Sequence, residues 1–261
     1  MTFHDHFSSQ AAGYARARPT YPAALFAELA ALAPGRSLAW DCGTGNGQAA
    51  RGLREHFERV LATDPSEAQL SQAPDHSGIE YRVAMEKDSG LPSRCVDLVT
   101  AAQAAHWFDM EAFNAEVRRV LRPGGVIALW CYNLLRISPA IDDRVRRFYA
   151  ETVGPFWPPQ RRHTETGYRA LAFPFPERRF PSIAMQQSWT LEELGAYLRT
   201  WSSVVRFVTA WGFDPVVPLL EDVSRIWGPA QRRRKVEWPL AGRLGWLPAT
   251  QEAGPPKPRG S

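Results

Sequence analysis

The fold is decided by the stretch LAWDCGTGNGQAA, residues 38–50, in which a short apolar run leads into a loop with three glycines. The run ends at Asp41, and Gly43, Gly45 and Gly47 follow at alternate positions. A glycine loop between a buried strand and a helix lets the protein backbone approach a nucleotide closely. The stretch therefore predicts a strand, a ligand-binding loop and a helix at the start of a nucleotide-binding α/β fold.

Strand-like and helix-like segments alternate through the first half of the chain. Apolar residues at helical spacing predict a helix directly after the glycine loop and another over residues 110–121. Short β-rich runs predict five strands, over residues 37–40, 59–63, 79–83, 96–102 and 126–132. Strands joined by helical crossovers indicate the α/β class and a doubly wound, Rossmann-like parallel sheet.

The pattern changes beyond Pro139. Prolines and aromatic residues become frequent, and helical spacing returns after Thr190 and Glu193, which form a capping-box pair. Two more strands are expected over residues 182–189 and 235–247, which gives a seven-stranded, mostly parallel sheet with an inserted helical cap. The predicted division is an N-terminal helical lid (1–36), an α/β core (37–138), a cap with the last two strands (139–248) and a disordered tail (249–261).

Composition excludes several classes of protein. With 44% hydrophobic and 22% charged residues the chain should be globular, and no apolar stretch approaches the roughly 18 residues of a membrane helix. No secretory segment is visible, so a cytoplasmic monomer or homodimer is expected. The three cysteines form no C-x-x-C pair, which disfavours a metal site. The basic run at residues 232–235 lacks interleaved aromatics, which disfavours nucleic acid.

Three ligands suit a glycine loop of this kind: a phosphate group, a dinucleotide, or S-adenosylmethionine (SAM). No Gly-Lys-Ser/Thr follows the loop, which excludes a P-loop, and Gln48 occupies the place where a dinucleotide fingerprint needs a small residue. Asp64 ends the second predicted strand and suits the ribose hydroxyls of NAD or SAM, although it also fits a helix cap before Pro65. Asp41 suits either ordering the loop or meeting the ammonium group of a methionine moiety.

Several motifs, in order, resemble those of class I SAM-dependent methyltransferases. They are WDCGTGNGQ, ATDPSEAQL, LPSRCVDLVTAAQAAHWFD and LRPGGVIAL, and HFSSQAAGYARARPTYP is similar to the N-terminal part of a branch that includes trans-aconitate methyltransferase and the type 11 small-molecule methyltransferases. The resemblance covers residues 7–132. It implies SAM as the cofactor and a small-molecule methyl acceptor as the partner.

The resemblance also implies roles for individual residues. Gly43 and Gly45 would let the backbone approach the cofactor, Gln103 would touch its methionine part, and Tyr14 and Arg18 would close over it. The turn AMEKDSG departs from the Ala-Glu-Asp of relatives, so Glu86 and Lys87 fill the place of the adenine contact. The implied cofactor set is Tyr14, Arg18, Asp41, Gly43, Thr44, Gly45, Asp64, Pro65, Glu86, Lys87 and Gln103.

Methyl transfer from a sulfonium is an in-line displacement, which needs a base only when the acceptor carries a proton. The candidate base is His106, which follows the fourth predicted strand, although it also suits a role in stabilising that loop. Candidate acceptor contacts are Trp107, Trp130, Trp201 and Arg206.

The loop after the fourth strand also bears on the acceptor, because it lacks the Asn/Asp-Pro-Pro-Tyr clamp of enzymes that methylate nucleic-acid bases. The sequence therefore predicts O-methylation of a small carboxylate or hydroxyl. Two alternatives stay open: a SAM-binding sensor without catalysis, and a nicotinamide-dependent oxidoreductase.

Overall fold

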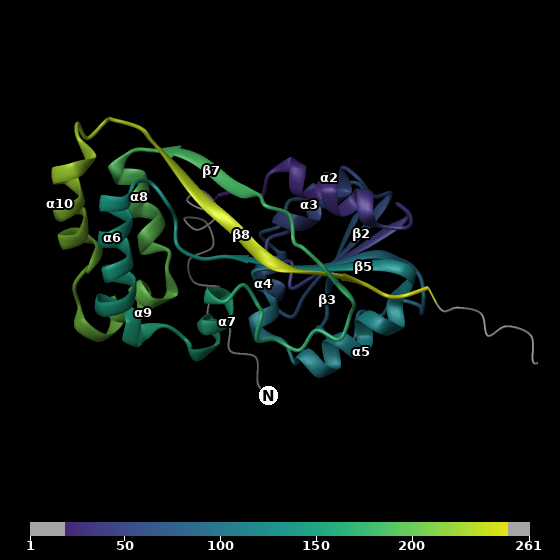
Figure 1. The fold of residues 1–261 in the computed structure, drawn as a ribbon. Helices are drawn as coiled ribbons and strands as arrows, with labels where there is room; N and C mark the ends of the chain where they lie inside the picture. The colour runs from purple at the N-terminus through teal and green to yellow at the C-terminus, as the bar shows by residue number, and fades with distance from the viewer. Residues whose placement is uncertain (1–18, 250–261) are drawn as a thin grey trace, which may run out of the picture.

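The computed structural model describes residues 19–249, so the predictions for Tyr14, Arg18 and the tail over residues 250–261 lie outside the described residues. Its centre is a parallel sheet made of β1 (Leu38–Cys42), β2 (Arg59–Asp64), β3 (Ile79–Val83), β4 (Val96–Ala102) and β5 (Leu121–Tyr132). Their order is β3-β2-β1-β4-β5, with every pair parallel. The predicted doubly wound α/β fold is confirmed (Figure 1).

Helices cover both faces of this sheet because neighbouring residues of a buried strand point to opposite sides. Helices α2 (Ala23–Leu32) and α3 (Gln48–Arg54) cover one face, while α5 (Met110–Val120) covers the other (Figure 1). In β1, for example, Ala39 joins the apolar cluster of α2 and α3, and Trp40 joins that of α5. Helix α2 falls in the range predicted as a lid, but its buried Leu25 and Phe26 make it a helix of the core.

The last position of the sheet is shared by two short strands. Strand β8 (Arg234–Trp246) pairs antiparallel with β5, and both β6 (Glu177–Arg178) and β7 (Ala184–Trp189) pair antiparallel with β8. Arg178 pairs with Leu244 and Ala184 with Pro239, so the register shifts by one residue between them. The sheet thus has eight strands where the sequence predicted seven, because β6 and β7 together occupy the position beside β8.

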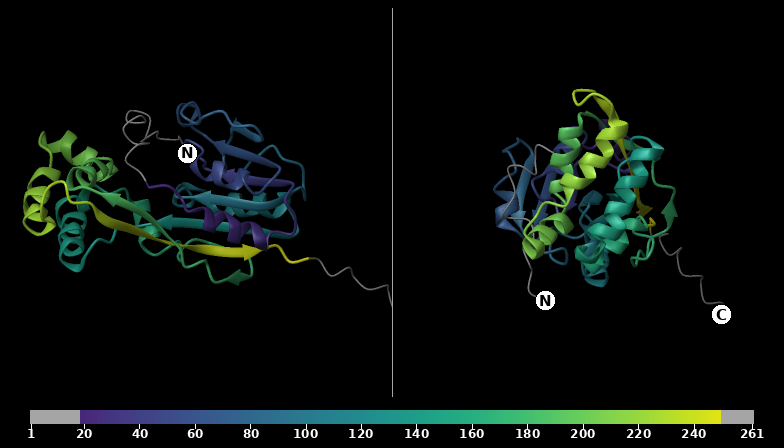
Figure 2. Two further views of the ribbon diagram at one scale, coloured as in Figure 1. Left: turned by 90° about the horizontal axis from the view of Figure 1, so that it is seen from above. Right: turned by 90° about the vertical axis from the view of Figure 1, so that its left-hand side faces the viewer.

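The second half of the chain folds into a group of helices at the far end of the β7–β8 ribbon, which we call the cap (Figures 1 and 2). It contains α6 (Pro139–Arg147), which runs into a π-helical turn (Phe148–Thr152), two 3-10 turns (Gly154–Phe156 and Pro159–Arg161) and α7 (Arg162–Glu165). Helices α8 (Leu191–Arg199), α9 (Ser202–Trp211) and α10 (Val216–Trp227) complete it. The capping box of Thr190 and Glu193 at the start of α8 is confirmed.

Two short elements complete the connections on the sheet side. Helix α4 (Glu67–Leu70) follows β2, and a single 3-10 turn (Ala105–Trp107) follows β4. Over residues 19–249, none of the helices combines the length and the apolar character that crossing a membrane requires. The four-part division of the chain stays a prediction.

Candidate active site

The carboxyl ends of the parallel strands carry the residues that the sequence singled out. Asp41 and Asp64 lie at the ends of β1 and β2, and Gln103 directly follows β4. Ligands of doubly wound sheets bind at this edge, beside the point where the strand order reverses between β1 and β4. The cap stands at the same end of the molecule.

Asp41 orders the glycine loop. Its side chain is 0% exposed, and its two carboxylate oxygens accept hydrogen bonds from the hydroxyls of Thr44 (2.6 Å) and Thr100 (2.7 Å). Burial raises the pKa of this carboxyl to about 6, in spite of the two hydroxyl donors. Of the two roles open for Asp41, these contacts favour ordering the loop. Thr44 helps to order it, because its hydroxyl is one of the two donors to Asp41.

The three glycines have positive φ angles, +69° at Gly43, +57° at Gly45 and +76° at Gly47, which L side chains rarely adopt. A Cβ on Gly43 would lie 2.5 Å from the Cβ of Ala104, and one on Gly47 would lie 2.4 Å from the hydroxyl of Tyr81. A Cβ on Gly45 would meet only the Gln69 side chain, at 3.8 Å. Gly43 and Gly47 thus make room for the protein itself, and only Gly45 borders open space.

The backbone amide of Gly43 is engaged inside the loop, where it donates to the carbonyl of Thr63 at 2.8 Å. The resemblance had implied that this amide approaches the cofactor, so the contribution of Gly43 to a cofactor site is shape alone. The amide of Gly45 donates to Asp64 at 2.9 Å, and that of Ser66 donates to the other Asp64 oxygen at 2.9 Å. These bonds hold the Asp64 carboxylate, 8% exposed, against the glycine loop, with Pro65 beside it.

Gln103 is held in an unusual conformation at the mouth of the site. Its φ is +55°, a strain on the order of 1 kcal/mol for a residue with a side chain. Its amide donates to the carbonyl of Trp130 at 2.8 Å, and its side-chain nitrogen donates to that of Tyr132 at 3.1 Å. Its side-chain oxygen is buried and has no hydrogen-bond partner among the described residues. A fixed, buried acceptor of this kind fits a ligand that donates a hydrogen bond.

The turn after β3 places Glu86 and Lys87 differently. Glu86 accepts a hydrogen bond from the amide of Asp109 at 3.2 Å, which joins this turn to the start of α5, and Lys87 is exposed. Next to them Val83 and Met85 are 55% and 37% exposed. The resemblance had implied that Met85 lies near the adenine ring; the exposure of Val83 was not expected, because exposure cannot be read from residue type.

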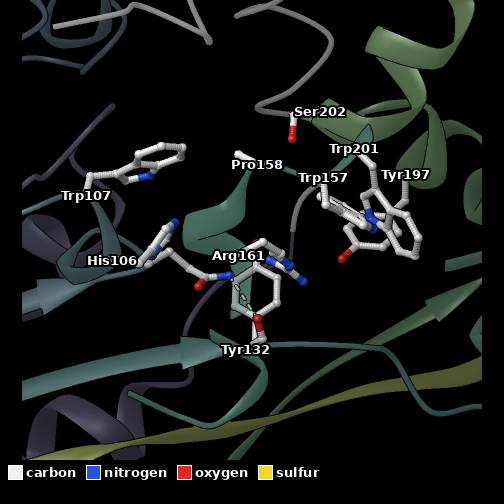
Figure 3. A pocket seen from close by; sticks show the side chains of 10 residues that line it. His106, Trp107, Tyr132, Trp157, Pro158, Arg161, Tyr197, Trp201 and Ser202 are labelled. Atoms are coloured by element: carbon white, nitrogen blue, oxygen red, sulfur yellow. Dashed lines mark hydrogen bonds between the residues drawn. The ribbon is translucent and has the colours of Figure 1, made fainter. Parts of the chain in front are cut away.

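A cavity of about 100 Å³ opens between the loop after β4 and the cap (Figure 3). Two of the predicted acceptor contacts line it, Trp107 and Trp201, together with His106 and Gln103. Its remaining lining comes from Tyr132, Trp157, Pro158, Arg161, Tyr197 and Ser202. The structure thus unites residues from the loop after β4, the end of β5 and the cap that are up to 99 positions apart.

The other two predicted acceptor contacts do not line this cavity. Trp130 is fully buried and packs edge-on against Tyr21 and Phe26, with ring centroids 5.6 and 6.4 Å away. Arg206 donates to the carbonyl of Phe156 at 3.4 Å, outside the lining. Trp130 thus belongs to the core, Arg206 joins two segments of the cap, and their contact with an acceptor stays a prediction.

His106 links the loop after β4 to the cap. Its Nδ1 is hydrogen-bonded to the hydroxyl of buried Tyr168 at 3.1 Å, and the two rings are stacked. Burial, together with the positive charge of Arg161, lowers the pKa of His106 to about 3. An effective general base has a pKa near the working pH, so this environment favours the loop-stabilising role over the catalytic one.

Arg161 is the functional candidate that sequence reasoning missed. In Figure 3 it lies between His106 on one side and the rings of Trp157, Tyr197 and Trp201 on the other. Nothing in the sequence separates it from the other arginines of the arginine-rich second half, because only the folded cap brings it to β4.

Comparisons with known proteins identify the family of the chain. A methyltransferase domain family matches residues 40–129. A Dictyostelium discoideum protein named for an expected methyltransferase activity is 33% identical over 224 residues, 84% of this chain and 85% of the relative. A Saccharomyces cerevisiae protein named for an expected SAM-dependent methyltransferase activity is 33% identical over 143 residues, 51% of this chain and 48% of the relative.

A solved structure from Anaeromyxobacter dehalogenans, described in similar terms as a type II methyltransferase, is 46% identical. It superposes with a TM-score of 0.84 over 88% of this chain and 98% of its own. The fold and the site define an enzyme of the SAM-dependent methyltransferase class. The chain belongs to the class I SAM-dependent methyltransferases, and its cofactor is SAM. The nicotinamide-dependent alternative is therefore wrong.

Proposed function

We propose that this methyltransferase transfers the methyl group of SAM to an oxygen of a small molecule bound in the cavity. The observation that carries the proposal is the position of this cavity, which is lined both by Gln103 and by aromatic residues of the cap. An acceptor there would lie beside the strand edge where the glycine loop and Asp64 are. A trans-aconitate-like branch is compatible with such a site.

We propose that Asp64 accepts the ribose hydroxyls of SAM and that Gly45 gives the cofactor room. Each oxygen of a carboxylate accepts more than one hydrogen bond. The two backbone amides that hold Asp64 therefore leave its oxygens able to accept hydrogen bonds from the ribose. The unpartnered oxygen of Gln103 suits the ammonium group of the methionine part. Thr44 and Asp41 support the loop, and Pro65, Glu86 and Lys87 would border the adenosine end. Tyr14 and Arg18 stay proposals from the resemblance alone.

Bound SAM supplies an electrophilic methyl group on a sulfonium. The work left to the protein is to align the acceptor with that methyl group and to exclude water, which is worth about 7–11 kcal/mol in favourable cases. Trp107 and Trp201 would hold the acceptor, and neutral His106 would hold the loop. An acceptor oxygen forms the new O–CH₃ bond as the S–CH₃ bond breaks, and the bonding pair stays on sulfur.

A SAM-binding sensor is the second candidate. It would need an acceptor site that is absent or filled by side chains. The cavity of about 100 Å³ beside Gln103 argues for the enzyme instead.

The test is to incubate the protein with methyl-labelled SAM and a panel of small carboxylic acids, phenols and alcohols. We expect label in a product ester or ether, with one S-adenosylhomocysteine (SAH) formed per methyl group transferred. SAH binding is measured in parallel from the shift of the unfolding midpoint. Tight SAH binding with no labelled product from any oxygen acceptor would overturn the proposal in favour of the sensor.

A further inference from the structure

The cap side of the cavity carries one fixed positive charge, that of Arg161. Its Nη2 donates to the side-chain oxygen of Asn133 at 3.0 Å and its Nε to the hydroxyl of Tyr149 at 3.3 Å, and Nη1 makes no hydrogen bond to any residue in 19–249. No carboxylate within residues 19–249 forms an ion pair with it, and Glu165 is reached only through the Tyr149 hydroxyl. The guanidinium is therefore held in place and is not neutralised by a direct partner.

The guanidinium of Arg161 makes cation–π contacts with the aromatic rings beside it. The guanidinium carbon lies 4.9 Å from the ring centroid of Trp157 and 5.8 Å from that of Tyr149. Rings of this kind otherwise form boxes for ammonium ligands. Here the guanidinium of Arg161 would repel an ammonium group, so the cap side of the cavity disfavours an amine acceptor.

Two further groups on this side of the cavity can donate hydrogen bonds to an anion. The indole nitrogen of Trp157 is buried and has no partner among the described residues. Ser202, the first residue of α9, lines the cavity, and Trp201 before it makes no side-chain cap bond to this ten-residue helix. The start of a helix carries a partial positive charge from its unpaired amides.

His106 adds no charge to the cavity. Its low pKa keeps the imidazole neutral near pH 7, and the positive charge of Arg161 is one cause of that shift. A hydroxyl acceptor would need a base to take its proton, whereas a carboxylate, with a pKa of roughly 4, arrives ionised. The site thus offers a positive charge and donors but no effective base.

We propose that the acceptor is a small carboxylate, anchored by Arg161 and by the indole nitrogen of Trp157. This inference rests on the proposed O-methyl transfer and names its substrate class. The carboxylate oxygen supplies the electron pair for the O–CH₃ bond, and no proton has to leave. Arg161 is a binding residue that selects for the anion, and Trp201 and Tyr197 cover the apolar part of the acceptor.

The test measures binding to the SAH complex of the full chain, without turnover. The probes are butanoate, butanamide and butylamine, which match in size and differ in charge, and the readouts are tryptophan fluorescence and titration calorimetry. We expect butanoate to bind at least tenfold more tightly than butanamide, butylamine not to bind, and added salt to weaken butanoate alone.

The variant Arg161→Met keeps much of the apolar stem and removes the charge, so it should abolish the preference for butanoate. Arg161→Lys should keep part of the preference, and the matched control Arg162→Met, at the exposed next residue, should keep all of it. Circular dichroism and SAH affinity establish that each variant is folded. If Arg161→Met does not fold, Arg161→Lys against Arg162→Met decides.

Equal binding of butanoate and butanamide to the wild-type complex, no binding of either, or a preference that survives Arg161→Met would each overturn the proposal. The outcome is separable from that of the methyl-transfer assay. Carboxylate selectivity without any labelled ester leaves the anion site standing and removes the O-methylation. Esters formed with an unchanged KM in Arg161→Met do the reverse.

Discussion

At the scale of single residues, the cofactor edge of the sheet depends on a few groups held in costly states. Asp41 is a fully buried carboxylate with a raised pKa, and Gln103 has a positive φ. Such states persist where the surrounding structure fixes them, and they gather at functional sites. Both residues support the glycine loop or the loop after β4, so small changes at either should be measurable.

Asp41 should give the protein a pH-dependent stability of unusual sign. Its pKa rises from 3.8 to about 6 on folding, so the folded state binds a proton more readily than the unfolded state. The free energy of unfolding should therefore fall, by up to roughly 3 kcal/mol from this group, as the pH rises from about 4 to about 6.

The variant Asp41→Asn isolates this effect. Urea unfolding at pH 4, 5, 6 and 7 should show wild type gaining on the variant at low pH and losing that advantage by pH 7. A constant difference between the two proteins, or one with the opposite slope, would show that Asp41 titrates normally in the folded state.

Gly43 and Gly45 should respond differently to alanine, although both have positive φ. A Cβ at Gly43 collides with Ala104, so Gly43→Ala should lower stability by about 2 kcal/mol or more. A Cβ at Gly45 projects into open space, so Gly45→Ala should cost about 1 kcal/mol of strain but weaken SAH at least tenfold. Urea unfolding and SAH titration check both, and equal SAH affinity in Gly45→Ala and wild type would contradict the placement of the cofactor there.

At the scale of elements, the β7–β8 ribbon joins the cap to the sheet. Strand β8 pairs with β5 through its second half and with β7 through its first half. One strand thus connects the sheet to the start of α8, where the capping box fixes the direction of the helix.

Loss of the capping box should loosen this connection. In Thr190→Ala the amide of Glu193 loses its acceptor, so we expect a loss of about 1 kcal/mol and a midpoint lower by roughly 2–4 °C. The matched control is Thr209→Ala, because Thr209 is exposed within α9 and its hydroxyl bonds only to the carbonyl of Val205. Thermal unfolding checks both variants. An equal drop of the midpoint in the two would show that the capping box contributes no more to stability than an ordinary exposed threonine.

At the scale of the whole molecule, the cavity joins the sheet to the cap. Gln103 and His106 come from the loop after β4, while Arg161 and Trp201 come from the cap. Two ligands bound on the two sides of this boundary should therefore protect different parts of the chain.

Hydrogen exchange with mass spectrometry tests this expectation. SAH alone should slow exchange in residues 41–47, 64–66 and 103–107, and addition of butanoate should extend protection to residues 157–162 and 201–204. Protection of the cap by SAH alone, with no further change on adding butanoate, would show that the cofactor rather than the acceptor spans the boundary. The variant Arg161→Met, which should not hold butanoate, serves as the control for nonspecific effects of the acid.

The sequence by itself determined the sheet, its glycine loop and the position of Asp64. These features are local: strand and helix periodicity, positive φ at successive glycines, and a carboxylate at a strand end can be read along the chain. Even the cap was predictable in outline from the capping box of Thr190 and Glu193.

Only the tertiary structure decided which side chains meet in the cavity. Trp130 and Trp157 look alike in sequence, yet one packs into the core against Phe26 and the other lines the cavity. Burial made His106 a poor base, and the fold of the cap brought Arg161 to β4 across more than fifty residues of chain. Long-range packing and the desolvation of buried groups set these properties. Neither can be predicted from the residues that flank a position in the sequence.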